Sequence, residues 1–295
     1  MKHILTLVVA FALTAPMVAS AQSTPSSGEK GALVRVISKW NDDCSADNRT
    51  SWDNMCDAWY DDITDTRSTP QGHGSRAWWR DGFYQNGNIS DDDFVDPRVW
   101  SWGNDDLDDR SDEADALLVG MHGGEQSNFG NDYFGAVRSD NACGTACNCT
   151  TAQQHMRFGD LDLEFLHFSS CFSMDWADRD EWELSFDGVH QINGFHGIMW
   201  ISTSYNGRYS GFSDDAFNIS ICESWVDNQY NGGFWTGGHD HCPVSRVAGN
   251  SSAEINDRLW EEEYDRVYSE PNSPSHFGTM WIGGCDPKEK GALPN

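Results

Sequence analysis

The sequence has few basic residues. Lysine and arginine together number 19 in 295 residues, against 47 aspartates and glutamates, so the formal net charge is -28. A chain with so little positive charge repels phosphate groups, which excludes nucleic acid and anionic membrane surfaces as partners. Many of the acids are aspartates in runs such as Asp91–Asp93, and we expect them to solvate the surface of an acidic protein.

Long hydrophobic runs are also missing. The apolar run Ile4–Val18 is shorter than the roughly 20 residues that a membrane-spanning helix needs, and no later run approaches that length. A lysine precedes it and the small residues Ala19-Ser20-Ala21 follow it, which is the order of a secretory signal peptide. We therefore predict a signal peptide at residues 1–21, cleavage near Ala21, no membrane span, and a secreted protein, either extracellular or periplasmic.

Several metal and cofactor motifs are absent. No aspartate run has the glycine and closing glutamate of an EF-hand calcium loop. The cysteines at 143, 147 and 149 lack the Cys-x-x-Cys-His pattern of haem attachment, and we interpret them as a disulfide knot in a loop. The run 239–242 has the sequence His-Asp-His-Cys, but no second ligand pair lies at finger-like spacing, so we predict a polar loop there and no metal site.

The cysteine count is odd. Nine cysteines follow the predicted signal peptide, so four disulfides would leave one thiol free in an oxidising compartment. Cys44 and Cys56 are close enough in sequence to form a local pair. The sequence does not determine the remaining connectivity.

Apolar runs alternate with helical patterns through most of the chain. This alternation predicts the α/β class, and specifically a three-layer α/β/α sandwich with a mostly parallel central sheet. The predicted strands are 32–37, 114–121, 161–168 and 194–201, and the predicted helices are 151–157, 175–182, 215–225 and 253–264.

The chain length fits one large domain. We assign residues 22–31 to a flexible lead-in and residues 32–295 to a single domain, with a loop-rich insertion at about 41–100. That insertion is rich in tryptophan, which could stack on sugars but more often fills a core.

Two reactive side chains directly follow predicted strands. His122 comes after the strand 114–121, and Cys171 comes shortly after the strand 161–168. The carboxyl ends of parallel strands meet at one edge of a sheet, where reacting groups gather. A thiol becomes a nucleophile when a base takes its proton, and imidazole is the usual base. Gly123 and Gly124 allow backbone N–H groups to approach a substrate carbonyl, as an oxyanion hole requires.

This arrangement resembles that of caspase-like cysteine peptidases, which include caspases, legumains, gingipains and clostripains. In these families an apolar strand ends in His-Gly, and about fifty residues later another ends in the nucleophilic cysteine. The resemblance implies a caspase-like fold, His122 as general base and acid, Cys171 as nucleophile, and Gly123 in the oxyanion hole. Caspases have Gln-Ala-Cys at the nucleophile, whereas this chain has Ser169-Ser170-Cys171, which leaves the substrate preference open.

The resulting hypothesis is a secreted cysteine peptidase whose partner is a peptide or protein substrate. It requires no cofactor, and calcium is kept open because similar secreted peptidases often bind it. The alternative is a catalytically inactive caspase-fold protein with an extracellular structural, adhesive or assembly role, whose partner would be another copy of itself or a cell surface. Asp115 and Asp187 are candidates for orienting a histidine, and the sequence does not choose between them.

Overall fold

The computed structural model describes residues 9–10, 30–40, 47–68, 72–107, 110–125, 132–137, 149–233 and 237–295. The strands are β1 (Val9–Ala10), β2 (Gly31–Val36), β3 (Trp79–Gln85), β4 (Ala116–Gly120), β5 (Gly123–Glu125), β6 (Tyr133–Ala136), β7 (Thr150–Ala152), β8 (Phe165–Ser169), β9 (Gln191–His196), β10 (Cys242–Gly249) and β11 (His276–Trp281). The α-helices are α1 (Ser51–Ile63), α2 (Asn206–Asp215), α3 (Ile221–Gln229) and α4 (Ser252–Trp260). Short 3-10 helices are η1 (Gly74–Arg76), η2 (Asn86–Asn88), η3 (Asp91–Phe94), η5 (Gln153–His155), η6 (Glu181–Ser185) and η7 (Thr203–Tyr205).

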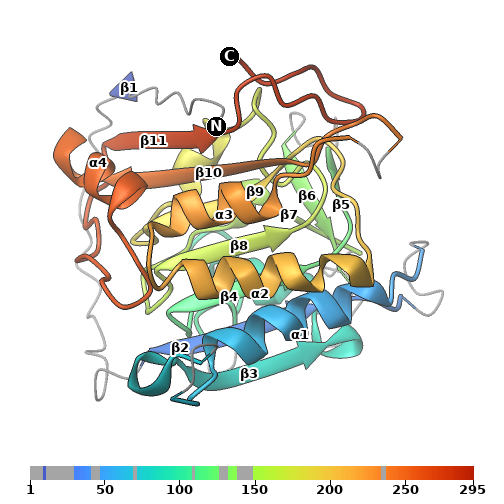
Figure 1. Ribbon diagram of the computed structural model, residues 1–295. Helices are drawn as coiled ribbons and strands as arrows, with labels where there is room; N and C mark the ends of the chain where they lie inside the picture. The colour runs from blue at the N-terminus through green and yellow to red at the C-terminus, as the bar shows by residue number, and fades with distance from the viewer. Residues whose placement is uncertain are drawn as a thin grey trace.

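A mixed, mostly parallel sheet forms the centre of the molecule (Figure 1). Within the described residues its strand order is β1-β11-β10-β9-β8-β4-β2-β3. Five adjacent strands are mutually parallel, in the order β3, β2, β4, β8 and β9. The strands β10 and β11 continue the sheet beyond β9 by antiparallel pairing. Every residue of β4 and β8 is buried, which explains their continuous apolar sequences. The prediction of an α/β protein with a mostly parallel sheet is confirmed.

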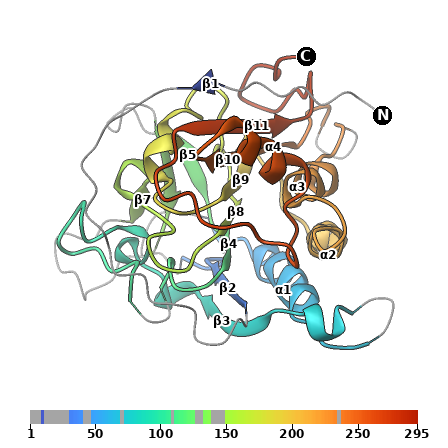
Figure 2. The ribbon, with the colours of Figure 1, turned by 90° about the vertical axis from the view of Figure 1, so that its left-hand side faces the viewer.

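The two faces of this sheet are covered differently. The helices α1, α2, α3 and α4 pack side by side in one row on one face, as Figure 2 shows. The small antiparallel sheet β5-β6-β7 lies over the other face, where Tyr133 packs on Phe168 and Trp182. In the described chain this second layer therefore consists of short strands and 3-10 turns rather than α-helices.

The segment 41–100, expected to be loop-rich, contains a helix and a strand of the main fold. The buried residues of α1 recur at helical spacing: Trp52, Met55, Cys56, Trp59, Tyr60 and Ile63. This stripe packs on the sheet beside β2 and β4. The expectation of loops is wrong for α1 and for β3, which extends the sheet at its edge, and the tryptophans of α1 fill the core.

Four other predicted elements differ from the structure. The segment 151–157 forms the end of β7 followed by η5, and 175–182 forms turns that lead into η6. The helix predicted at 215–225 is the end of α2 and the start of α3, because Ser220 caps a new helix by accepting a hydrogen bond from the Glu223 N–H. The third core strand is β9, which ends where Gly197 adopts a left-handed φ of 72°.

The predicted signal peptide contains only β1 among the described residues. These two residues pair with β11 at one edge of the sheet, so cleavage near Ala21 would leave β11 as the edge strand. Most of the predicted lead-in, 22–29, lies outside the described residues, and Gly31 already begins β2. Of the helices described, none combines the length and the apolar character needed to cross a membrane.

Candidate functional site

The pairing of β4 with β8 brings the two predicted catalytic segments together. Gly120 lies opposite Ser169 in this parallel pair, and the Met121 N–H donates to the Ser169 carbonyl at 3.3 Å. His122 and Cys171 each lie two residues beyond these aligned positions. Both therefore emerge at the carboxyl edge of the sheet from neighbouring strands.

Gly123 contacts the cysteine segment directly. A Cβ atom built on Gly123 would lie 2.3 Å from the Cys171 carbonyl oxygen and 2.3 Å from Ser170 Oγ. Only glycine permits so close an approach, because a side chain would displace the backbone that carries the thiol. The sequence singled out this glycine for its approach to a substrate, whereas its immediate neighbour in the structure is the cysteine backbone.

His122 is held between two tryptophans and a backbone carbonyl. Its ring centroid lies 4.8 Å from that of Trp40 and 4.9 Å from that of Trp52. Its Nε2 donates a hydrogen bond to the Asp47 carbonyl oxygen at 2.8 Å, which fixes the tautomer and leaves Nδ1 as the basic nitrogen. Burial lowers the pKa of His122, so the ring is neutral and able to accept a proton at neutral pH.

Cys171 carries a free, half-buried thiol. Its Sγ donates to the Met199 carbonyl oxygen at 3.5 Å, and burial raises its pKa to about 11. The thiol is therefore protonated at neutral pH and needs a base to become nucleophilic. Within the described hydrogen bonds, the His122 and Cys171 side chains do not bond to each other.

The residue after the cysteine has an unusual backbone conformation. Phe172 has a φ of 57°, in the left-handed region, and its N–H donates to the Gly197 carbonyl at 2.8 Å. This conformation costs a non-glycine residue about 1–2 kcal/mol. Strain of this kind persists where the surroundings enforce it, and it is concentrated at functional sites.

Hydroxyl groups hold the backbone that leads to Cys171. Ser169 Oγ accepts hydrogen bonds from Trp52 Nε1 at 3.0 Å and from the Tyr209 hydroxyl at 2.6 Å. Ser170 Oγ lies 2.9 Å from the Tyr133 hydroxyl. Ser169 and Ser170 thus anchor the end of β8 to both layers.

The Gly123 N–H faces away from the small sheet. The Ala136 N–H donates to the His122 carbonyl at 2.7 Å, so His122 and Ala136 form a hydrogen-bonded pair of the antiparallel ladder. The next pair, Gly123 and Gly135, is then a non-hydrogen-bonded pair whose N–H groups point outward. Gly124 instead packs on the Phe134 ring, which lies 2.8 Å from a Cβ built at that glycine.

The structure separates the other predicted residues from this site. Asp115 precedes β4 at the opposite edge, where it accepts a hydrogen bond from the Gly31 N–H at 2.5 Å. Asp187 pairs with Arg98 at 2.8 Å. Neither orients His122; the Asp47 carbonyl does so. The residues that the sequence did not predict at the site are Trp40, Asp47, Trp52 and Met199, all contributed by segments outside the two motifs.

The structure shows which of the described cysteines form disulfides and which carry free thiols. Cys242 forms a disulfide with Cys285, so it cannot serve as a zinc ligand with the neighbouring histidines. Cys149 is also disulfide-bonded. Cys56 is a buried free thiol, so the pairing with Cys44 is not formed, and Cys44 itself lies outside the described residues, as do the cysteines at 143 and 147.

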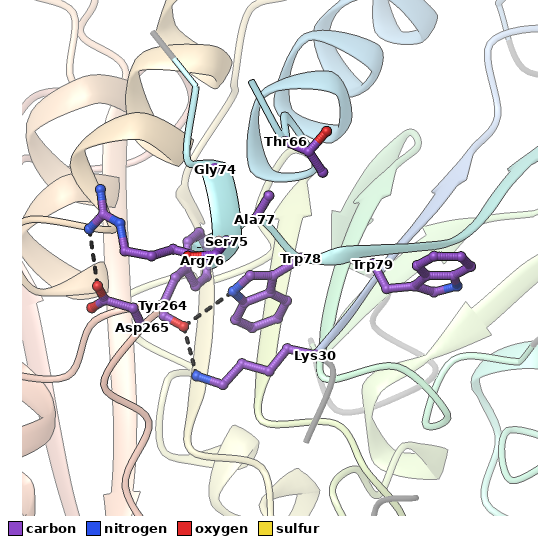
Figure 3. A pocket seen from close by; sticks show the side chains of 10 residues that line it. All are labelled: Lys30, Thr66, Gly74, Ser75, Arg76, Ala77, Trp78, Trp79, Tyr264 and Asp265. Atoms are coloured by element: carbon purple, nitrogen blue, oxygen red, sulfur yellow. Dashed lines mark hydrogen bonds and ion pairs between the residues drawn. The ribbon is translucent and has the colours of Figure 1, made fainter. Parts of the chain in front are cut away.

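A cavity of about 510 Å³ lies at the other edge of the sheet, where β2 and β3 begin (Figure 3). Lys30 Nζ and Trp78 Nε1 both donate to the Tyr264 carbonyl oxygen beside it, at 2.8 and 3.2 Å. Trp79, one of the residues that line it, is 65% exposed. Because the strands run away from this edge toward His122, the cavity is not part of the His122–Cys171 site.

Residues 108–284 match the family model DUF6345, which is described as a domain of unknown function. The chain belongs to the DUF6345 family. The range matched by DUF6345 is more than half of the chain and contains both His122 and Cys171. The sheet extends beyond it, since β2 and β3 precede the matched range and pair with β4 and with each other. The chain has no match among curated proteins.

Proposed function

We propose that this protein is a secreted cysteine peptidase of caspase-like fold, with Cys171 as nucleophile and His122 as general base and acid. The observation that carries the proposal is the close approach of Gly123, the residue after His122, to the Cys171 carbonyl oxygen and the Ser170 hydroxyl at the carboxyl edge of the sheet. Two further features support it: Cys171 is a free thiol in a chain that also contains the disulfide Cys242–Cys285, and a backbone carbonyl orients the histidine.

The proposed reaction is acyl transfer. Cys171 Sγ attacks the carbonyl carbon of a peptide bond while its proton passes to His122 Nδ1, and a C–S bond forms. The oxyanion accepts hydrogen bonds from the outward-facing Gly123 N–H and from the Cys171 N–H. The imidazolium then protonates the leaving amine as the C–N bond breaks. Water attacks the thioester with His122 as base, the C–S bond breaks, and the carboxylic acid and the thiol are released.

The neutral resting state is consistent with this sequence of steps. Burial disfavours both the thiolate and the imidazolium, so the resting pair is neutral and the proton is transferred as the thiol attacks an electrophile. Hydrogen bonds between catalytic groups are often longer without substrate than in the reacting complex. Substrate binding would have to turn the thiol from the Met199 carbonyl toward His122 Nδ1.

A second candidate is a catalytically inactive protein of the same fold with a structural, adhesive or assembly role outside the cell. One observation favours it: the Cys171 thiol has a raised pKa and a hydrogen bond to Met199 rather than to His122. In this case the strained turn at Phe172 would be a property of the scaffold alone.

The two candidates differ in one measurement. The purified chain is incubated with a peptide library derived from a digested proteome, and new termini are identified by mass spectrometry. The peptidase proposal expects cleavage that is lost in Cys171→Ala and in His122→Ala and retained in Cys222→Ala, which removes a buried free thiol elsewhere. Cleavage that persists in Cys171→Ala would contradict the proposed nucleophile, and absence of cleavage by the unaltered protein would favour the second candidate.

A further inference from the structure

The acidic residues of this protein are not confined to its surface. Asp91, Asp92 and Asp93, expected to solvate the surface, are 2%, 3% and 0% exposed. Asp105 and Asp112, which lie further along the same region, are both 0% exposed. Burying a carboxylate costs several kcal/mol unless a cation or hydrogen-bond donors compensate it. Each buried aspartate therefore requires a specific partner.

One group of carboxylates gathers between two loops. Asp105, Asp106 and Asp112 precede β4, and Asp160 lies in the turn that precedes β8. One ligand oxygen each from Asp106, Asp112 and Asp160 lies within 4.8 Å of the others. Oxygens bound to one calcium ion at about 2.4 Å are at most about 4.8 Å apart, so this spacing fits a shared cation.

Asp105 lacks the compensation that its burial requires. Among the described residues, neither of its two side-chain oxygens has a hydrogen-bond partner. The charges of Asp106 and Asp160 act on Asp105, and the charge of Asp105 acts on Asp112, so its carboxylate lies near the group, next in sequence to Asp106. One buried oxygen of Asp106 and one of Asp160 also lack a partner in the described part of the chain. Three carboxylates thus bring unpaired oxygens to the same place.

Among the described residues, Arg98 is the basic side chain that forms an ion pair with this group. Arg98 contacts Asp96, Asp160 and Asp187 at 2.5, 3.0 and 2.8 Å. Of the four inner carboxyl groups, Asp160 is the one whose described contacts include an ion pair with Arg98. The two oxygens of Asp112 accept from the Gly159 and Leu161 N–H groups at 2.6 and 3.2 Å, which hold the carboxylate in place but carry no full charge. In the described part of the chain, the inner group therefore has four acids and one shared guanidinium.

We propose that Asp105, Asp106, Asp112 and Asp160 form a binding site for a calcium ion. The ligands are carboxylates only, which suits a hard cation and not zinc, whose usual ligands are histidine and cysteine. Magnesium keeps most of its water shell, whereas a site with buried carboxylates from two loops suits the larger and less strictly octahedral calcium ion. The ion would tie the loop before β4 to the loop before β8 at the amino edge of the sheet.

This site is independent of the proposed peptidase chemistry, because His122 and Cys171 lie at the carboxyl edge. Its predicted role is to stabilise the two loops that lead into β4 and β8. The alternative is that the carboxyl groups are neutralised by protons. The variant Asp105→Asn separates the two: it removes calcium-dependent stabilisation only if calcium binds, whereas it replaces an already neutral group if the carboxyl groups are protonated.

The test uses the full mature chain, stripped of metal with EGTA. Calcium binding is measured by equilibrium dialysis against radioactive calcium, and thermal unfolding is followed in EGTA, in millimolar CaCl2 and in equal MgCl2. The expected result is one calcium ion per chain and a rise of several degrees in the unfolding midpoint with calcium. Asp106→Asn, a half-buried position, should weaken binding at least tenfold. Asp178→Asn, in a separate acidic group where Lys290 forms ion pairs with Glu125 and Asp175, should leave it unchanged.

Two outcomes would overturn the proposal. One is the absence of bound calcium at millimolar concentration in the unaltered chain, which needs no variant to fold. The other is a calcium effect of equal size in Asp105→Asn, Asp106→Asn and Asp178→Asn. An Asp105→Asn protein that is more stable in EGTA and no longer responds to calcium would support it.

Discussion

The α-carbon of Gly123 packs directly on the carbonyl oxygen of Cys171, so that a Cβ at this glycine would lie 2.3 Å from that oxygen. Gly123→Ala should force the β5 start and the cysteine backbone apart. The expected cost is about 2 kcal/mol or more of unfolding free energy, together with loss of any reaction at Cys171. Gly207→Ala in α2 is the control, because no described atom lies within 4 Å of its added Cβ and alanine favours a helix. Equal denaturant midpoints for the two variants would contradict this packing.

The hydroxyl of Ser169 accepts hydrogen bonds from two buried donor groups. Ser169→Ala should leave Trp52 Nε1 and the Tyr209 hydroxyl without their acceptor, at a cost of about 2 kcal/mol or more. The matched control is Ser213→Ala, a buried serine whose hydroxyl has no hydrogen-bond partner within the described residues. That variant should be neutral or slightly stabilising. Chemical denaturation of both proteins measures the difference, and a similar loss in both would show that the Ser169 contacts contribute nothing.

His167 should make the protein sensitive to acid. It is buried in β8, between the Asn193 amide at 2.9 Å and the Tyr264 hydroxyl at 2.9 Å, and burial lowers its pKa from 6.5 to about 3. Because the folded pKa is the lower one, its stabilising contribution is complete above pH 6.5 and is lost as the pH falls from 6.5 toward 3. The slope approaches about 1.4 kcal/mol per pH unit for one proton.

His167→Gln removes this titration while keeping a donor and an acceptor. Unfolding free energies measured by guanidinium titration between pH 6.5 and 5 should fall less steeply in the variant than in the unaltered protein. His190 and His241 also have lowered pKa values and remain, so part of the slope persists. Identical slopes would mean that His167 does not stay neutral in the folded state.

Much of the sheet, and the position of His122 and Cys171 at its carboxyl edge, could be predicted from the sequence. The strands β4 and β8 are buried on both faces, so their sequences are continuous apolar runs that stop where the chain reaches the edge. His122 and Cys171 follow those stops within two residues. The same logic failed for the end of β9, because the apolar residues 198–201 continue past Gly197 into a loop.

Other features of the site could not be predicted, because they depend on residues that are far apart in the sequence. The residues around His122 and Cys171 come from distant segments: Trp40 follows β2, Trp52 is in α1, and Met199 follows β9. No spacing rule connects them. The helix α1, in contrast, has an apolar stripe at every third or fourth residue, so its signal was present in the sequence but was obscured by the aspartates between the apolar positions. The buried acids were not predictable, because an aspartate run has the composition of a solvated surface.

The direct test of the His122–Cys171 pair is the rate of thiol alkylation in the native, unreduced protein. Iodoacetamide is added between pH 6 and 9, and the modified cysteines are located by mass spectrometry. Cys56 and Cys222, both fully buried, are internal controls that should react only after unfolding. If His122 takes the proton, Cys171 should react well below its own pKa of about 11, and His122→Ala should slow it at least tenfold. A Cys171 that reacts at the same rate in both proteins, or only in denaturant, would contradict the catalytic pair.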